Sequence, residues 1–341
     1  MGKLGKTLLT ALSLAFGVLT LASARSRKAR YYLNMILFTS GLAVCSLLGV
    51  TLSLLMALIP GQRFNVNFVI ARTFYKIMSP LTGIRMVVEG QEHMTEQRSA
   101  IIVGNHQSQL DVLYLGAMMP KRCVMMSKKE LRWAPLLGQF LALGGAVFID
   151  RKSRSRAIAT MREAGQYMKR ENLALFAFPE GTRSNLPIPD LLPFKKGVFH
   201  LAIQSQIPII PVVCENYFKL YDSRSWFDAG TLHIACLEPI STQGLTEADT
   251  DQLIGTVRTA MLKKLRQFDA ESDRADVEST LHPSKDPRPY PARGVAGLAM
   301  RLIGSGHEHK LQRIAQETER VSQTNPDGKP SDFGLRSAAA Q

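Results

Sequence analysis

A histidine and an aspartate stand where a predicted strand gives way to a predicted helix. His106 follows the apolar run 100–104, and Asp111 precedes the amphipathic segment 112–119, so the chain is expected to turn between them. On one regular helix the two would lie about 140° apart, which is unfavourable for contact. They can meet if His106 lies in the turn before the helix and Asp111 in its first turns. The aspartate would then fix the imidazole tautomer and leave the other ring nitrogen free to accept a proton.

The sequence around this pair offers no convincing enzyme nucleophile. Ser108 is the nearest candidate, but the G-x-S-x-G pattern of a nucleophile elbow does not surround it. It is better explained as a turn or helix-capping serine. The pair therefore favours direct attack by a substrate hydroxyl group, with His106 as general base. Alone, a histidine and an aspartate at this spacing are weak evidence, because a histidine at a strand end is often only structural.

A second polar segment follows another predicted strand, at 173–178, which is expected to end at Pro179. The residues after this proline are Glu180, Gly181, Thr182 and Arg183. An arginine can bind phosphate through two parallel hydrogen bonds, a glycine lets the backbone approach closely, and a threonine adds a hydroxyl group. The segment is therefore a candidate anion site. The alternative is a solvated surface turn in which Glu180 and Arg183 form an ion pair.

The elements that must position these residues alternate in type. Predicted strands occupy 84–89, 100–104, 121–127, 146–150, 173–178, 207–213 and 231–237. Predicted helices occupy 109–119, 134–143, 153–170, 195–206 and 246–268, and the last begins with a capping-box-like segment at 246–249. The alternation predicts an α/β domain over 84–268, with a mixed, largely parallel sheet flanked by helices. We interpret the apolar run 136–143 as a core helix rather than an acyl-chain tunnel.

The chain ahead of this domain is strongly apolar. Residues 7–24 and 31–60 form two uncharged runs, and about 20 apolar residues suffice for one helix to cross a bilayer. We therefore assign 1–62 to a membrane anchor with two apolar segments, although 22–24 also resembles a signal-peptide cleavage site. The segment 63–83 mixes apolar and basic residues. It is either an interfacial amphipathic helix or a helix packed on the domain.

A basic cluster separates the two apolar runs, and it consists of Arg25, Arg27, Lys28 and Arg30. Positive residues beside membrane segments tend to stay in the cytosol, which places this loop there. If both runs crossed the bilayer, the domain would face the opposite side, yet basic residues flank its start as well. A re-entrant second run or a non-spanning first run would remove the conflict, and the pattern alone does not choose between them.

Composition indicates the class of partner. The net charge of +14 and the isoelectric point near 9.8 indicate anionic partners. Because the long apolar runs lie before residue 61, membrane phospholipids are favoured over nucleic acid. Residues 269–341 are predicted to be a polar, largely disordered tail, with a short amphipathic helix at 294–303 as an exception. Four scattered cysteines form no C-x-x-C pair, and His307 and His309 in the tail lack further ligands, so no metal is predicted.

Four blocks of the sequence, taken in order, resemble the glycerolipid acyltransferase family, and most closely its 1-acyl-glycerol-3-phosphate (lysophosphatidate) acyltransferases. The blocks are NHQSQLD at 105–111, the segment 129–151 ending in FIDR, FPEGTRS at 178–184 and IPIIPV at 207–212. Four ordered blocks are far more specific than any one of them. The resemblance covers roughly 84–240, which is about half of the chain.

The resemblance implies roles for individual residues. His106 would be the general base and Asp111 its orienting partner. The residues implied in substrate binding are Asn105, Arg151, Glu180, Gly181, Thr182 and Arg183. The segment 180–183 would bind the glycerol phosphate of the acceptor, with Arg151 as a second candidate for substrate contact.

The reaction expected from the resemblance is transfer of a fatty acyl group from acyl-CoA, a co-substrate, to the sn-2 hydroxyl group of lysophosphatidate, with no cofactor. The alternative enzyme activity is acyl transfer to another lysophospholipid or to glycerol 3-phosphate. A non-catalytic membrane protein that binds anionic lipid is the alternative outside enzymes. The expected location is a membrane: the endoplasmic reticulum of a eukaryote with a cytosolic active site, or the inner membrane if the source is bacterial.

Overall fold

A seven-stranded sheet runs through the centre of the protein, whose computed structural model describes residues 2–94, 96, 99–150, 154–281 and 293–300. The strands are β1 (Ile84–Glu89), β2 (Ala100–Gly104), β3 (Cys123–Lys128), β4 (Val147–Ile149), β5 (Ala174–Ala177), β6 (Ile209–Cys214) and β9 (Gly230–Cys236). They lie in the order β1-β9-β6-β2-β5-β3-β4, and every neighbouring pair is parallel except β6 and β9. The predicted mixed, largely parallel sheet is confirmed.

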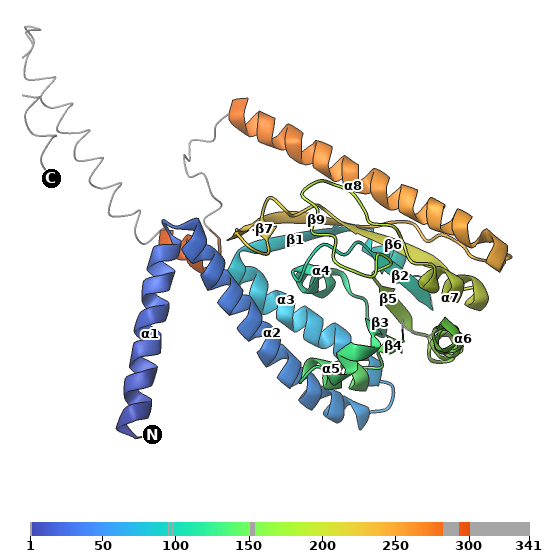
Figure 1. Cartoon of the computed structure of the whole chain (residues 1–341), viewed down its shortest axis with the longest axis horizontal. Coiled ribbons are helices and arrows are strands. Elements are labelled where there is room, and N and C mark those ends of the chain that lie inside the picture. Colours follow the sequence, from blue (N-terminus) through green and yellow to red (C-terminus); the bar gives the residue numbers. More distant parts are fainter. Residues whose placement is uncertain (1, 95, 97–98, 151–153, 282–292, 301–341) are drawn as a thin grey trace, which may run out of the picture.

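Helices cover both faces of the sheet (Figure 1). The first face is packed by α2 (Arg27–Ala57), α3 (Val66–Thr82), α4 (Asp111–Met118) and α5 (Leu137–Leu143). The second face is packed by α6 (Arg154–Glu171), α7 (Gly197–Ser205) and α8 (Thr250–Leu281). Along β2 the side chains alternate, so that Ile102 faces the first core while Ile101 and Val103 face the second. A strand with both faces buried explains why the run 100–104 is apolar throughout.

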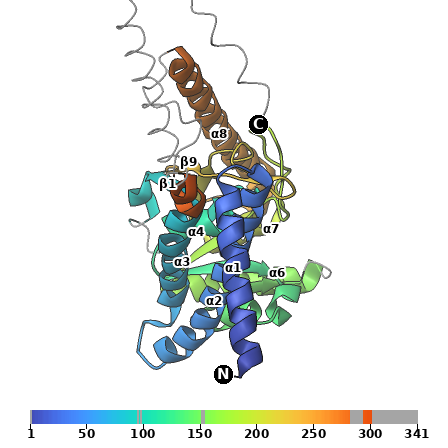
Figure 2. The same cartoon turned by 90° about the vertical axis from the view of Figure 1, so that its left-hand side faces the viewer.

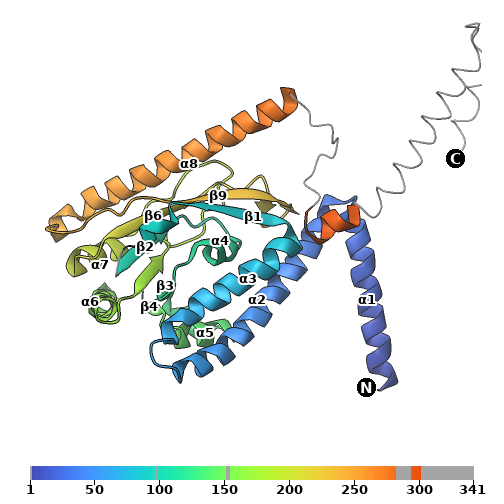
Figure 3. The same cartoon turned by 180° about the vertical axis from the view of Figure 1, so that it is seen from behind.

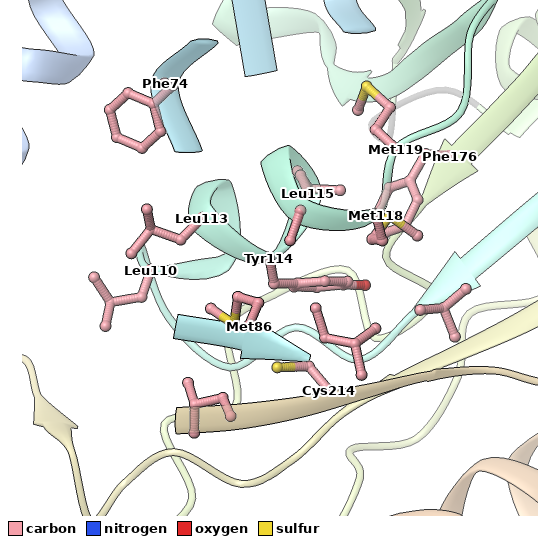
Figure 4. Packing of buried hydrophobic residues seen from close by; sticks show 14 of the residues in the cluster. Phe74, Met86, Leu110, Leu113, Tyr114, Leu115, Met118, Met119, Phe176 and Cys214 are labelled. Carbon is pink, nitrogen blue, oxygen red and sulfur yellow. The ribbon is translucent and has the colours of Figure 1, made fainter. Parts of the chain in front are cut away.

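The helix α4 is enclosed by the first core. Leu113, Tyr114 and Met118 are each 0% exposed, and Figure 4 shows these side chains packed among neighbours from the sheet and from α3. On its outer side, α3 packs between α4 and α2, with Phe74 and Met78 buried. The start of α4 is therefore held in place by apolar packing on several sides.

A short hairpin holds the start of α2 against the domain. The sequence analysis did not predict its strands, which are β7 (Tyr221–Asp222) and β8 (Trp226–Phe227). Directly after it, Asp228 is 1% exposed and accepts hydrogen bonds from Arg27 Nε at 2.6 Å and Arg30 Nη1 at 3.1 Å. Nearby, Asn34 Nδ2 donates to the backbone oxygen of Phe227 at 2.8 Å. The first turns of α2 thus belong to the packed domain.

The first helix, α1 (Lys3–Ser23), projects away from the domain, as Figure 3 shows from behind. Both α1 and α2 are long and apolar enough to cross a membrane, but their surroundings differ. The apolar stretch of α1 is 0% buried, whereas 22% of that of α2 is buried. The opposite side of α2 presents Leu47, Leu48 and Leu54 to the outside. Two apolar helices therefore precede the domain, as predicted, and only the second is packed on it.

Two helices extend the order beyond the predicted end of the domain at 268. After a capping box between Thr246 and Asp249, α8 continues to Leu281. Residues 269–281 contain no glycine or proline, so the backbone can stay helical without an apolar face to bury. The first part of the predicted tail is therefore helical.

A short helix at 294–300 lies at the junction of α1 and α2, near the end of α3 (Figure 2). It falls within the amphipathic segment predicted at 294–303. Gly83 and Gly294 both have positive φ (78° and 74°), and a Cβ atom on Gly294 would lie 2.9 Å from Gly83 N. Ala296 and Ala299 are buried, while Leu298 is 57% exposed. This helix packs on the domain through its small residues.

Candidate active site

His106 lies in the turn between β2 and α4, and Asp111 is the first residue of α4. The ring nitrogen His106 Nδ1 is 2.6 Å from Asp111 Oδ2. The predicted contact is confirmed, and it arises as the helix geometry required, with the histidine outside the regular helix. Because Nδ1 faces the carboxylate, Nε2 is the ring nitrogen available to a substrate.

Asp111 is 1% exposed, and its side chain accepts hydrogen bonds on both oxygens. Oδ2 also accepts from the backbone N–H of Gln107 at 2.9 Å, and Oδ1 accepts from Tyr217 Oη at 2.6 Å. Ser108 Oγ lies 2.9 Å from Tyr217 Oη and accepts from the backbone N–H of Leu110 at 3.0 Å. Ser108 is thus a turn serine, as interpreted from the sequence. Donors on several sides hold the carboxylate in one orientation.

The imidazole ring of His106 is stacked on Phe178, the residue directly after β5. The ring centroids are 3.9 Å apart and the planes differ by 14°. The histidine side chain is 19% exposed. One face of the imidazole ring is therefore covered by an aromatic ring, and stacking adds to the Nδ1 contact in fixing the position of the imidazole.

The side chain of Glu180 holds the backbone of His106. Its Oε1 accepts from the backbone N–H of His106 at 2.7 Å, and its Oε2 accepts from that of Leu192 at 2.9 Å. The residue is 2% exposed, and this burial raises the pKa of the carboxyl group against the opposing effect of its two backbone donors. Both oxygens are thus engaged with backbone, in contrast to the surface ion pair with Arg183 considered from the sequence.

Asn105 and Gln107 join the turn between β2 and α4 to the end of β6. Asn105 Nδ2 donates to Cys214 O at 2.9 Å, and its Oδ1 accepts from Cys214 N at 2.8 Å. Gln107 Nε2 donates to Cys214 O at 3.1 Å and to Glu215 O at 2.9 Å. Asn105 is 1% exposed, so its side chain is engaged in aligning two neighbouring loops.

The second motif runs beside the first. Ser184 N donates to His106 O at 2.8 Å, and Asn185 N donates to Gln107 O at 3.0 Å. Gly181 has a φ of 73°, a left-handed conformation that favours glycine, where the chain turns after β5. Thr182 and Arg183 are exposed. The two motifs, far apart in sequence, thus form one surface on which Arg183 is open to a ligand.

A cavity of about 270 Å³ opens at this surface. Its polar residues include His106, Asp111 and Arg183. Its apolar walls come from α2, α3, α4 and α5 and include Leu42, Phe74, Leu115, Leu137 and Phe140. The apolar run 136–143, interpreted from the sequence as core, therefore contributes side chains to this cavity. The arrangement places an imidazole and a guanidinium group at a cavity whose walls are mainly apolar.

A second hollow, of about 380 Å³, lies on the other side of Phe178. Gly181, Lys195 and Gly197 line it, together with apolar residues such as Met126 and Met161. The second motif is therefore divided, with Arg183 facing the first cavity and Gly181 the second.

Arg151, His307 and His309 lie outside the described residues. Within the described part of the chain, no group of three or more His, Cys, Asp or Glu side chains is placed to hold a metal ion.

The sequence did not predict the roles of three residues of the site, which are Gln107, Phe178 and Tyr217. Phe178 was assigned to a strand end and to the block at 178–184 without a role of its own, although its place before Pro179 was a signal. Tyr217 follows a predicted strand that ends at 213, and polar residues beyond the carboxyl ends of strands commonly face a site.

Comparison with known proteins gives a consistent match. The family model described as Acyltransferase matches residues 85–215. The 1-acyl-sn-glycerol-3-phosphate acyltransferase of Saccharomyces cerevisiae is 39% identical over 239 residues, covering 70% of this chain and 78% of that protein. The human 1-acyl-sn-glycerol-3-phosphate acyltransferase beta is 38% identical over 251 residues, covering 73% of this chain and 88% of that protein.

A solved structure matches as well. The crystal structure of the 1-acyl-sn-glycerophosphate (LPA) acyltransferase PlsC from Thermotoga maritima aligns with a TM-score of 0.57 at 25% identity. It covers 71% of this chain and 98% of that one. The alignment supports the same α/β architecture that the strand order gives.

Proposed function

This chain belongs to the 1-acyl-sn-glycerol-3-phosphate acyltransferase family, and on that premise we propose that it transfers a fatty acyl group to the sn-2 hydroxyl group of lysophosphatidate, forming phosphatidate. The observation that carries the proposal is the contact between His106 and Asp111 at the mouth of an apolar cavity that Arg183 also lines. A base, an anion-binding group and an apolar chamber are the three features that acyl transfer to a phosphorylated lipid requires.

In the proposed reaction the donor is acyl-CoA, used as a co-substrate without a cofactor. His106 Nε2 accepts the proton of the acceptor hydroxyl group as its oxygen attacks the thioester carbonyl carbon. A carbon–oxygen bond forms, the carbon–sulfur bond breaks, and the proton passes to the departing thiolate. Asp111 holds the imidazole ring and stabilises its positive charge while it carries the proton.

We propose that the other predicted site residues divide into two groups. Arg183 binds the phosphate of the acceptor, supported by its exposure beside His106. Gly181 and Thr182 shape the anion-binding turn, and Arg151 remains a second candidate for substrate contact. Asn105 and Glu180 act through the backbone, since their side chains are buried and bonded to main-chain groups.

The direct test replaces the proposed base. His106→Gln is expected to lower acyl transfer at least roughly 1000-fold, within the range lost when a general base and its positioning are removed together, while the protein remains in the membrane fraction. His200→Gln, on α7 at the opposite face of the sheet, serves as the matched control and should keep wild-type turnover. Substantial turnover by the purified His106 variant would exclude the mechanism.

A second experiment identifies the acceptor. It measures acyl transfer by the purified protein to lysophosphatidate, to other lysophospholipids and to glycerol 3-phosphate.

We also propose a membrane arrangement. The ion pairs of Arg27 and Arg30 with Asp228 keep the basic loop and the α/β domain on the same side of the bilayer. Because a basic loop favours the cytosol, the active site is cytosolic and α1 alone crosses the membrane. The outward face of α2 then contacts membrane phospholipids from the cytosolic side. The membrane is proposed to be the endoplasmic reticulum.

A further inference from the structure

Tyr217 contacts the histidine–aspartate pair from the protein interior. The residue is 2% exposed, and it is absent from the described residues that line the cavity. Its hydroxyl oxygen lies 2.6 Å from Asp111 Oδ1, the carboxylate oxygen that His106 does not use. In sequence the tyrosine lies 106 residues from this aspartate. It therefore cannot contact a bound acceptor, but it can act through Asp111.

The direction of each hydrogen bond in this group can be deduced. A carboxylate only accepts, so Tyr217 donates its single hydroxyl proton to Asp111. The Tyr217 oxygen must then accept from Ser108, whose own oxygen accepts from the backbone N–H of Leu110. The bonds thus run in one direction, from Ser108 through Tyr217 to Asp111, and the carboxylate ends the series by accepting from His106 as well.

The tyrosine is held in this place by the catalytic turn. Tyr217 N donates to Gln107 Oε1 at 3.3 Å, while Gln107 Nε2 donates to Glu215 O at 2.9 Å. Asn216, the preceding residue, donates from Nδ2 to Ile188 O at 2.8 Å. The loop that carries the tyrosine is therefore fixed before any substrate binds, and the hydroxyl group needs no rearrangement to reach Asp111.

Resting on the proposed acyl transfer, we propose that Tyr217 is a positioning residue that holds Asp111 in the orientation in which His106 accepts the proton. It also draws part of the carboxylate charge away from the imidazole. Without the hydroxyl group, one buried carboxylate oxygen loses its donor and more negative charge acts on the ring. The protonated imidazole of His106 is then favoured. In the variant, His106 therefore loses its proton and becomes able to act as a base only at a higher pH.

The other ionisable groups around His106 and Asp111 do not obscure this effect on the pH profile. Those groups are Cys45, Tyr114, Glu180, Arg183, Cys214 and Glu215. Burial raises the pKa of Tyr217, Tyr114 and Cys214 well above their usual values, so these groups keep their protons near neutral pH. Tyr217→Phe removes the Tyr217 hydroxyl group alone and leaves the six surrounding groups chemically unchanged. A displaced pH profile in that variant therefore reports on His106 and its aspartate.

The test compares two buried tyrosines in the full-length protein. Tyr217→Phe is expected to lower kcat roughly 10- to 100-fold, to leave KM for lysophosphatidate within about twofold, and to move the acid limb of the kcat/KM profile to higher pH. Tyr114→Phe is the control, because its hydroxyl group is buried and, among the described residues, has no hydrogen-bond partner. Figure 4 shows the side chain of Tyr114 projecting from α4 into the packed apolar core. Its kcat and pH profile should match the wild type.

Two results would overturn the proposal: wild-type kcat in Tyr217→Phe, or a lower kcat with an unchanged pH profile, which would mean a purely structural role. If Tyr217→Phe does not fold, Ser108→Ala removes the donor to Tyr217 and should move the profile in the same direction, with a loss of roughly threefold. An unmoved profile in that variant would also count against the proposal.

A readout that needs no turnover separates this proposal from the proposed function. Nitrogen-15 NMR titration of the His106 ring in wild type and Tyr217→Phe should show protonation at higher pH in the variant. If the wild type transfers no acyl group to any acceptor but this difference is present, the proposed function fails and the role of Tyr217 stands. If transfer occurs and the titrations coincide, the role of Tyr217 fails alone.

Discussion

At the scale of single residues, the site separates side chains that line the cavity from side chains that hold the loops. His106 and Arg183 reach the cavity, while Glu180 and Asn105 are buried and bonded to backbone. The same motif therefore supplies both kinds of residue, because a loop that presents an arginine to a ligand also needs its own main chain fixed. The distinction predicts different consequences for replacing Arg183 and Glu180.

Arg183→Ala is expected to raise KM for lysophosphatidate roughly 10- to 100-fold, because a charge-assisted hydrogen bond to phosphate contributes about 1.5–3 kcal/mol. KM for acyl-CoA should change much less. Arg266→Ala, an exposed arginine on α8, removes the same charge away from the cavity and controls for general lipid attraction. Steady-state kinetics with both substrates varied make the comparison. Equal changes in the two KM values would remove the assigned role.

Glu180→Gln should change how stability depends on pH. Burial raises the pKa of Glu180 above its usual 4.5. Below pH 4.5 the carboxyl group is protonated in both the folded and the unfolded protein, and its full contribution to the free energy of unfolding is present. As the pH rises, the unfolded chain ionises first, and this contribution is lost until the folded carboxyl group ionises too. Glutamine does not titrate. The stability advantage of wild type over the variant should therefore shrink across this window.

Denaturant unfolding of the two proteins at several pH values checks the prediction for Glu180. Asp190→Asn, a half-exposed carboxylate in the same loop, is the control. A gap that widens with rising pH would show that the two backbone donors outweigh burial.

At the scale of elements, the sequence predicted what depends on local pattern and missed what depends on distant partners. All seven strands of the main sheet were predicted. Central strands such as β2 and β6 are buried on both faces and give a continuous apolar run, whereas the edge strand β1 alternates between buried and exposed residues. The hairpin of β7 and β8 was missed because two residues per strand give no periodicity. The contact of His106 with Asp111 was predictable from five residues of chain, whereas that of Tyr217 with Asp111 joins different loops.

The ion pairs of Asp228, directly after the hairpin, are expected to be essential for holding α2 on the domain. Asp228→Asn removes the carboxylate from two arginines and leaves Arg30, whose side chain is 9% exposed, without that charged partner. Breaking a buried ion pair in this way destabilises by about 3–5 kcal/mol. The thermal unfolding midpoint in detergent should fall, and hydrogen exchange in the first turns of α2 should rise. Asp222→Asn, on the neighbouring strand, should do neither, and equal effects of the two changes would exclude a specific role for this ion pair.

At the scale of the whole molecule, the arrangement of α1, α2 and the domain supports the proposed answer to the conflict that the sequence left open. The basic loop at 25–30 cannot lie across the bilayer from the domain while Arg27 and Arg30 bind Asp228. One apolar helix projects from the domain and one is packed on it, and we therefore propose a single span followed by a helix that stays on the cytosolic side. Neither hydropathy nor charge could give this result, since both helices are apolar and both flanks are basic.

This arrangement predicts which positions share a side of the membrane. Lys28→Cys in the first turn of α2 and Arg224→Cys in the hairpin turn should both react with a membrane-impermeant maleimide from the cytosolic side of sealed vesicles. Gly2→Cys, at the other end of α1, should react only from the opposite side. The four native cysteines are all buried and should give little background. Labelling of Lys28→Cys and Arg224→Cys from opposite sides would require α2 to cross the bilayer, and the ion pairs of Asp228 would then have to be broken in the membrane.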